Sequence, residues 1–244
     1  MLPLNNQLAE ICGIHSGDGY LRGEGKRWEL DISGNVEEKN YYDYNVKLLF
    51  ESFFKIKINC RIFNSRNTYG FVIRDREIIK FVHNLGFPYG NKSTTVKVPN
   101  FILNSNNKEI IKSFIRGLFD TDGCISFRKR TQGKYSEFKR VHHYYPVIKF
   151  SSVSKQLIQN LTILLQKLEY DKIKFYIYKP KKKTENLRYI IVLYGDDKSN
   201  KFLKEIKPKN PVKLSRFLLW KKIGFCPANL TYNQRLEMLK NHSK

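Results

Sequence analysis

The stretch "FIRGLFDTDGCISF", residues 114–127, decides the fold, because it combines the end of a helix with the start of a strand. Apolar residues recur through it at helical spacing, and an Asp-Gly pair then marks a turn. An earlier stretch, "LAEICGIHSGDGYL" at residues 8–21, has the same organisation. Gly117 lies five residues before Asp122, and Gly13 lies five residues before Asp18. We therefore predict two equivalent halves in one chain.

The remaining hydrophobic pattern supports this internal repeat. The first half predicts helices and strands in the order helix 7–17, strands around 27–33, helix 38–54, strands 57–63 and 68–74, and helix 76–87. The second half repeats the order with helix 106–123, strands 124–130 and 146–152, helix 154–170, strands 172–179 and 188–195, and helix 199–206. Each half is thus αββαββα, which predicts an α+β fold.

The repeat also predicts the domain organisation. We expect an N-terminal half at residues 1–104, a C-terminal half at 105–216 and a helical extension at 217–244. The second half is longer, and the most economical explanation is an inserted hairpin at residues 127–146. The extension is rich in apolar residues and predicts one or two helices packed on the body, without a chemical role.

Composition restricts the partners. The 244 residues include 45 Lys and Arg against 22 Asp and Glu, a formal net charge of +23, which favours nucleic acid as a polyanionic partner. An anionic membrane is the rival, but no apolar run is long enough to span a bilayer. The N-terminus does not resemble a signal peptide, so we expect an intracellular protein, in a prokaryotic cytoplasm or an organelle matrix, that is not secreted. The four cysteines lack zinc-ligand spacing.

The two terminal acids need an explanation. Glycine inside a helix costs about 1 kcal/mol relative to alanine, so Gly13 and Gly117 suggest close helix–helix packing. Such packing would bring Asp18 and Asp122 together at helix C-termini, where negative charge is disfavoured. A hard cation such as Mg²⁺ would stabilise paired carboxylates, and it also binds phosphate oxygens. A metal between two acids on a basic protein suits phosphodiester hydrolysis.

The segments "ICGIHSGDG" (11–19) and "IRGLFDTDG" (115–123) resemble the two signature motifs of the LAGLIDADG homing endonucleases, in the monomeric two-motif branch. The second motif is a close match, whereas the first has His15 in place of an apolar residue and Ser16 in place of an acid. The resemblance implies two four-stranded antiparallel sheets that form a DNA-binding saddle, with the paired motif helices at the interface. It also implies a metal at the helix ends, held by Asp18 and Asp122 with Gly17 and Thr121.

The family further uses a basic residue in each half near the scissile phosphates. The resemblance points to Lys92 in "LGFPYGNKS" and to Lys213 in "IKPKNPVKLS", with Lys209 as the alternative. Asn35 and Ser152, just after the second strand of each half, are candidates for a polar rim. Any single lysine in so basic a chain could equally be a solvated surface charge.

Basic and polar residues cluster in the predicted strands and hairpins, as DNA recognition by a sheet requires. The predicted DNA-binding residues are Arg22, Lys26, Arg27, Arg61, Asn64, Arg66, Asn67, Arg74, Arg128, Arg130, Gln132, Lys134, Lys139, Arg140, Lys149, Lys174, Tyr176, Tyr178, Lys181, Lys183 and Arg188. Because the halves differ, we expect a long and only weakly palindromic target.

The leading hypothesis is a monomeric, Mg²⁺-dependent, site-specific endonuclease that cuts double-stranded DNA and leaves 3′ overhangs. We expect Mn²⁺ to substitute and Ca²⁺ to bind without cleavage. The ends of the chain do not resemble intein splicing residues, which favours an intron-encoded or free-standing protein. The alternatives are an RNA maturase that binds intron RNA, a non-cleaving DNA-binding regulator of the same fold, and a basic ribosome-associated protein. The last would leave the paired Asp-Gly motifs unexplained.

Overall fold

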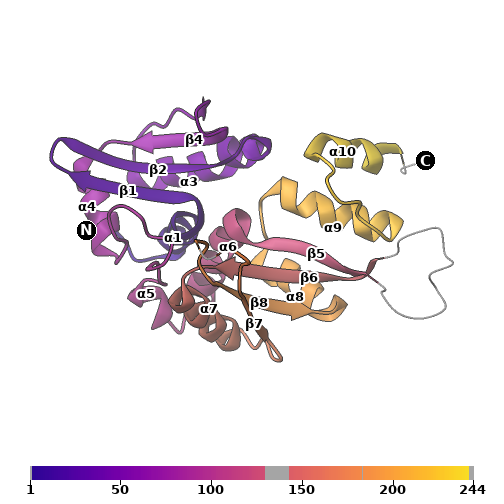
Figure 1. The fold of residues 1–244 in the computed structure, drawn as a ribbon. Helices are drawn as coiled ribbons and strands as arrows, with labels where there is room; N and C mark the ends of the chain where they lie inside the picture. Colours follow the sequence, from indigo (N-terminus) through magenta and orange to yellow (C-terminus); the bar gives the residue numbers. More distant parts are fainter. Residues whose placement is uncertain (1, 130–142, 183, 242–244) are drawn as a thin grey trace.

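The computed structural model describes residues 2–129, 143–182 and 184–241, and contains two four-stranded antiparallel sheets (Figure 1). The elements of the first half are α1 Asn6–Asp18, β1 Gly19–Glu24, β2 Arg27–Asn35, α2 Lys39–Tyr41, α3 Lys47–Phe54, β3 Arg61–Phe63, β4 Thr68–Ile73 and α4 Arg76–Asn84. The predicted helix 38–54 is interrupted by a π-helical turn at Tyr42–Val46, and a 3-10 turn at Val36–Glu38 precedes it. The predicted strand 57–63 is shorter than expected and covers Arg61–Phe63.

The second half repeats the arrangement. Its elements are α5 Asn100–Leu103, α6 Lys108–Asp122, β5 Cys124–Lys129, β6 His143–Ser152, α7 Lys155–Lys167, β7 Lys174–Tyr178, β8 Arg188–Tyr194 and α8 Asp196–Ile206. The strand orders are β1-β2-β4-β3 and β5-β6-β8-β7, so each sheet has its second and fourth strands paired at the centre. The predicted α+β fold with two four-stranded sheets is confirmed.

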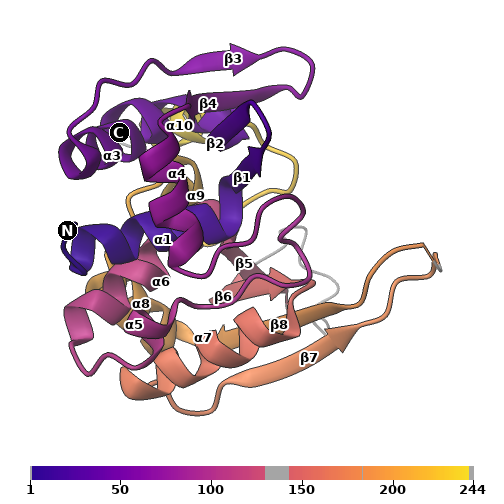
Figure 2. The same ribbon diagram turned by 90° about the vertical axis from the view of Figure 1, so that its left-hand side faces the viewer.

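The two motif helices lie side by side between the sheets (Figure 2). Asparagine caps both N-termini: the Asn5 side chain accepts a bond from the Leu8 amide, and the Asn107 side chain accepts one from the Glu109 amide. Gly13 packs on the backbone of α6, and Gly117 packs on the backbone of α1. A Cβ on Gly13 would overlap the Phe114 carbonyl oxygen, so glycine is required for this approach.

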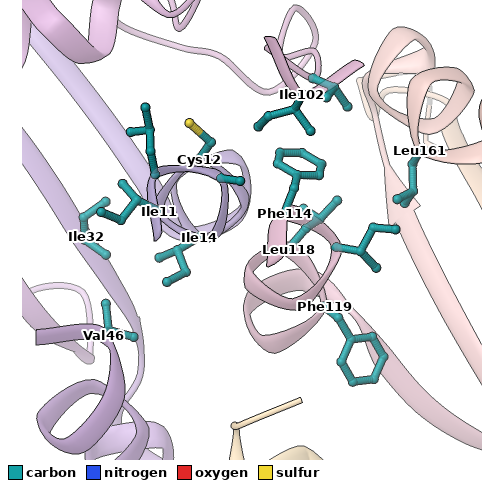
Figure 3. Packing of buried hydrophobic residues seen from close by; sticks show 14 of the residues in the cluster. Ile11, Cys12, Ile14, Ile32, Val46, Ile102, Phe114, Leu118, Phe119 and Leu161 are labelled. Atoms are coloured by element: carbon teal, nitrogen blue, oxygen red, sulfur yellow. The ribbon is translucent and has the colours of Figure 1, made fainter. Parts of the chain in front are cut away.

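A continuous hydrophobic core joins the halves. Ile11 and Ile14 point from α1 toward Ile32 and Val46, whereas Phe119 projects from α6 on the side away from α1 (Figure 3). The apolar strand residues on one face of each sheet pack on these helices, and the residues that alternate with them lie on the opposite face. No helix in the described part of the chain is long and apolar enough to cross a membrane.

The extension forms two helices, α9 Pro211–Ile223 and α10 Tyr232–Asn241, in line with the expected one or two. The boundary expected between residues 216 and 217 lies inside α9, because Asn210 and Pro211 begin this helix earlier. We therefore propose to place the start of the extension at the loop 207–210. The extension contacts the first half as well as the second, since the Tyr232 amide donates a hydrogen bond to Glu37 Oε1 at 3.2 Å.

Candidate metal centre and nucleic-acid interface

The ends of α1 and α6 bring the two predicted acids together. A Cβ on Gly17 would lie 3.2 Å from the Asp122 carboxyl carbon and would overlap the Thr121 side chain. Asp18 is half-buried, whereas Asp122 reaches the surface. The structure thus places Asp18, Asp122, Gly17 and Thr121 at one point between the two sheets.

Asp18 has a polar pocket of its own. Tyr42, from the π-helical turn, donates a hydrogen bond to Asp18 Oδ2 at 2.6 Å. Gly34 on β2 makes room for this contact, because a Cβ there would lie 2.7 Å from both oxygens and 3.1 Å from Glu38 Oε2. No hydrogen bond of the described residues gives Asp122 a tyrosine partner, so the two acids are not equivalent.

Burial raises the pKa of both acids, and the charge of Asp122 adds to the shift at Asp18. Burial, followed by the charge of Asp122, raises the pKa of Asp18 to about 7, although the Tyr42 hydrogen bond and Lys213 oppose the shift. The surrounding protein also raises the pKa of Asp122, against the charges of Lys213 and Lys92. Glu38 is a third carboxyl group close to Asp18, and burial raises its pKa as well. Three carboxyl groups, of Asp18, Asp122 and Glu38, thus share this site with the ammonium groups of Lys92 and Lys213.

The two predicted lysines both reach the helix ends. Lys92 Nζ donates to the carbonyl oxygens of Ser16 and Gly17, at 3.0 and 2.9 Å. Lys213 Nζ donates to the carbonyl oxygens of Phe119 and Gly123, at 3.0 and 2.8 Å, and to that of Thr121. Each ammonium thus bonds carbonyls at a helix C-terminus and lies at the negative end of the helix dipole, where positive charge is favoured.

The alternative lysine lies in a different cluster. Lys209 Nζ bonds Glu10 Oε1 at 2.7 Å, and Arg116 bonds Glu10 Oε2 at 2.8 Å. This buried Glu10 ties α1 to α6 and to the loop before α9. Lys209 therefore stabilises the interface and is not at the acids.

The side chains of the two rim candidates accept hydrogen bonds from nearby backbone amides. Asn35 Oδ1 accepts a hydrogen bond from the Glu37 amide at 2.9 Å, and Ser152 Oγ accepts one from the Ser154 amide at 3.1 Å. Asn35 thus caps the 3-10 turn Val36–Glu38, whereas α7 is capped by Ser154, two residues after Ser152. Within the described part of the chain, no hydrogen bond joins the side chain of Asn35 or Ser152 to Asp18 or Asp122.

The outer acid of the second motif anchors the extension. Asp120 is fully buried and accepts hydrogen bonds from the backbone amides of Lys209 and Asn210, at 2.9 and 3.1 Å. The Asn210 side chain in turn donates to the Asp120 carbonyl at 2.7 Å and to Glu38 Oε1 at 2.8 Å. The side chain of Ser16, the counterpart of Asp120, donates to the Cys12 carbonyl within its own helix at 2.8 Å. Asp120 thus fixes the loop from which α9 presents Lys213.

The acids suit a hard cation. Neither Asp18 nor Asp122 forms an ion pair within residues 2–129, 143–182 and 184–241. The same part of the chain gathers no cluster of three or more His, Cys, Asp or Glu side chains around a metal site. Two carboxylates without a direct ion pair among the described residues could bind a metal whose other ligands are water, carbonyls or phosphate, a donor set that Mg²⁺ favours.

Substitution of Lys213 and Lys92 tests whether their ammonium groups stabilise the C-terminal ends of the two motif helices. Lys213→Met is expected to lower the free energy of unfolding by about 2 kcal/mol, because three carbonyls lose a charged partner. Lys92→Met, with two carbonyls affected, is expected to cost less. Urea unfolding would measure both, with the exposed Lys26→Met as control. Equal stability of the Lys213 and Lys26 variants would contradict the capping role.

The predicted DNA-binding residues lie on the sheet faces away from the core and in the turns. Strand pairing places Arg22, Arg27, Arg61 and Arg74 on the first face, and Arg128, Lys149, Lys174, Tyr176, Tyr178 and Arg188 on the second. The turns carry Lys26, Asn64, Arg66, Asn67 and Lys181, all exposed. Outside the described residues lie Arg130, Gln132, Lys134, Lys139, Arg140 and Lys183.

Residues 109–207 match the family model of the LAGLIDADG-like domain. This part of the chain is therefore similar to a LAGLIDADG-like domain. The whole chain has the two-motif LAGLIDADG fold, as two solved structures show. A mutant of I-SmaMI aligns at a TM-score of 0.57 with 11% identity and covers 98% of both chains. A variant of the homing endonuclease I-DmoI aligns at 0.54 with 15% identity, over 83% of this chain and 96% of that one.

The LAGLIDADG fold also occurs in other settings. The N-terminal LAGLIDADG domain of WhiA aligns at a TM-score of 0.50 with 14% identity, over 85% of this chain and 83% of that one. Among curated proteins, the replication factor C small subunit of Methanocaldococcus jannaschii is 26% identical over 210 residues, 85% of this chain but 10% of that protein. The helicase Hel308 of Thermococcus kodakarensis is 25% identical over 235 residues, which cover 95% of this chain and 18% of that protein. The chain thus spans between 8% and 18% of the length of the curated relatives that it matches.

Three residues of the site were not predicted from the sequence: Tyr42, Glu38 and Asn210. The spacing of apolar residues predicts a regular helix here and does not indicate the π-helical turn that places Tyr42 next to Asp18. Asn210 follows the usual signal of an N-cap before proline, which predicts the start of a helix but not the bond to Glu38.

Proposed function

We propose that this chain is a site-specific endonuclease that cuts double-stranded DNA with a divalent metal, Mg²⁺, held by Asp18 and Asp122. The observation that carries the proposal is the pair of acids without ion-pair partners at the contacting ends of two helices, between two basic sheet faces. I-DmoI, which shares the fold, has been solved in complex with DNA and Ca. One chain supplies both acids, so the active form would be a monomer.

The residues of the site would have different roles in cleavage. Asp18 and Asp122 would hold the metal, with the carbonyls of Gly17 and Thr121 beside them. The metal, when bound, would polarise the scissile phosphate and activate water. Tyr42 orients one oxygen of Asp18, and Lys92 and Lys213 hold the helix ends and add positive charge where phosphates approach. The two basic faces would position a DNA duplex across both halves.

Cleavage of a randomised duplex library tests the proposal. We expect products with staggered 3′ overhangs in Mg²⁺ or Mn²⁺, and binding without cleavage in Ca²⁺. Sequenced ends would define one long, weakly palindromic site. Binding to one site without cleavage in any metal would instead favour a regulator, a reading supported by the similarity to WhiA.

The raised pKa values predict an unusual pH dependence. Asp18 keeps its proton in the folded protein up to about pH 7, whereas the unfolded chain releases it near the ordinary value of about 4. Without metal, stability is therefore expected to fall as pH rises through this range, and cleavage in Mg²⁺ is expected to rise from about pH 6 to 8.

Thermal unfolding from pH 5.5 to 8.5 (a range of about three units around the Asp18 pKa) measures this dependence. Mg²⁺ is expected to raise the unfolding temperature most at the high-pH end, where the acids are ionised. Asp18→Asn serves as the control and is expected to reduce the metal-free dependence without abolishing it, because burial also raises the pKa of Asp120 to about 7. A wild-type unfolding temperature that rises with pH and ignores Mg²⁺ would contradict the proposed site.

A further inference from the structure

The outer face of the second sheet differs in chemistry from that of the first. A groove of about 750 Å³ runs over β5, β6, β7 and β8. Its lining includes the aliphatic side chains of Val147, Ile190 and Val192. Three tyrosines also line it: Tyr145, Tyr176 and Tyr194. No carboxylate lines this groove among the described residues.

The groove tyrosines form a connected cluster. Tyr194 and Tyr176 share a hydrogen bond of 3.4 Å between their hydroxyl groups, and the Tyr145 and Tyr194 rings meet at right angles with centroids 6.5 Å apart. Arg128 donates to the Tyr145 hydroxyl at 3.1 Å and lies 6.0 Å from the Tyr194 ring centroid. This face therefore combines aliphatic and aromatic side chains with the cations Arg128, Lys149 and Lys174.

The first face is built from charged pairs instead. Arg74 bonds Glu29 at 3.2 Å, and the partly exposed Arg66 bonds Asp31 at 2.8 Å. Strand pairing places Glu29 opposite Arg22 on β1, so acids and arginines alternate across this face. Both carboxylate acceptors and guanidinium donors are thus available to a ligand.

In the major groove of DNA, base pairs differ in the same way as the two sheet faces, since some present an apolar group and others present only polar groups. The thymine methyl is the only apolar group on its base edges, whereas guanine presents two acceptors and cytosine an amino donor. Arginine suits guanine, and a carboxylate suits cytosine. Aliphatic and aromatic side chains gain from contact with methyl groups and offer cytosine no charged acceptor.

We infer that the two halves read different bases: the sheet β5-β6-β8-β7 reads its half-site through thymine methyl groups, and the sheet β1-β2-β4-β3 reads a half-site rich in G·C pairs. The inference rests on the proposed function. The occupant of the groove is the major groove of a DNA duplex, which the surrounding cations and the net charge of +23 favour.

Replacement of thymine by uracil tests the inference, because it removes only the methyl group. Duplexes bound in Ca²⁺ would be selected from a randomised DNA library. Tyr176→Ala and Arg74→Ala, at exposed positions on the second and first faces, assign the half-sites, since each relaxes base preference only under its own sheet. Uracil in the second half-site is expected to weaken binding about fourfold per contacted methyl. Uracil in the first half-site is expected to leave binding unchanged.

Tyr176→Ala also supplies a matched control. The loss caused by uracil is expected to shrink in this variant and to persist in Arg74→Ala. If the wild type binds and cuts its selected site but tolerates uracil throughout, the thymine inference is overturned and the endonuclease proposal stands. If no duplex is selected, or RNA is bound in preference to DNA, the proposed function itself fails.

Discussion

Asp18→Asn and Asp122→Asn are each expected to lower the rate of double-strand cleavage at least about 10³-fold. A metal contributes several kcal/mol to stabilisation of the transition state, and each 1.36 kcal/mol corresponds to about a tenfold change in rate. Asparagine keeps the size of the side chain but removes the charge that holds the cation. Binding in Ca²⁺ is expected to change only a few-fold, because the sheet faces are untouched.

Cleavage of the selected duplex under single-turnover conditions measures the loss, and a gel-shift titration measures the binding. Asp197→Asn, an exposed acid on α8, is the matched control and should cleave like the wild type. The environments of the two acids differ, so strand-specific labels should be used to detect nicking. Wild-type cleavage by either site variant would rule out the shared metal.

Gly117→Ala is expected to give the largest loss of stability. Its new Cβ would overlap the Glu10 carbonyl oxygen and lie 2.8 Å from the Ile14 amide nitrogen, both backbone atoms that cannot rotate away. Overpacking of this kind costs about 3 kcal/mol, more than the gain of about 1 kcal/mol in helix propensity. The two motif helices would have to separate, which would also move Asp122 away from Asp18.

Urea unfolding of Gly117→Ala measures this effect, and Gly25→Ala provides the comparison. Gly25 has a positive φ of 53° but nothing within 4 Å of its Cβ position, so only backbone strain of about 1 kcal/mol is expected there. Equal losses in the two variants would show that the helix crossing accommodates a methyl group. Gly13→Ala should behave like Gly117→Ala, because the Phe114 carbonyl faces it in the same way.

The motif helices, the order of the strands and the pairing of the acids could be predicted from the sequence, because they follow from local spacing. Lys213 could be predicted only through the family resemblance, and its position at the end of α6 depends on the anchor that Asp120 makes 89 and 90 residues away. Long-range contacts of this kind leave no periodic signal. The pocket around Asp18 was missed for a similar reason, since Gly34 is a strand residue whose importance appears only when Tyr42 and Glu38 pack above it.

The bridge from Asp120 through Asn210 to Glu38 has a consequence for protein engineering. It makes the halves poor modules, even though they repeat one topology, because a residue of the C-terminal segment completes a buried contact in the N-terminal half. A chimera assembled by exchange at the linker near residue 104 would leave Glu38 or Asn210 facing a foreign surface without its amide or carboxylate partner. Such a recombination would have to carry the Glu38 turn together with α9, so the natural unit of exchange is discontinuous in sequence.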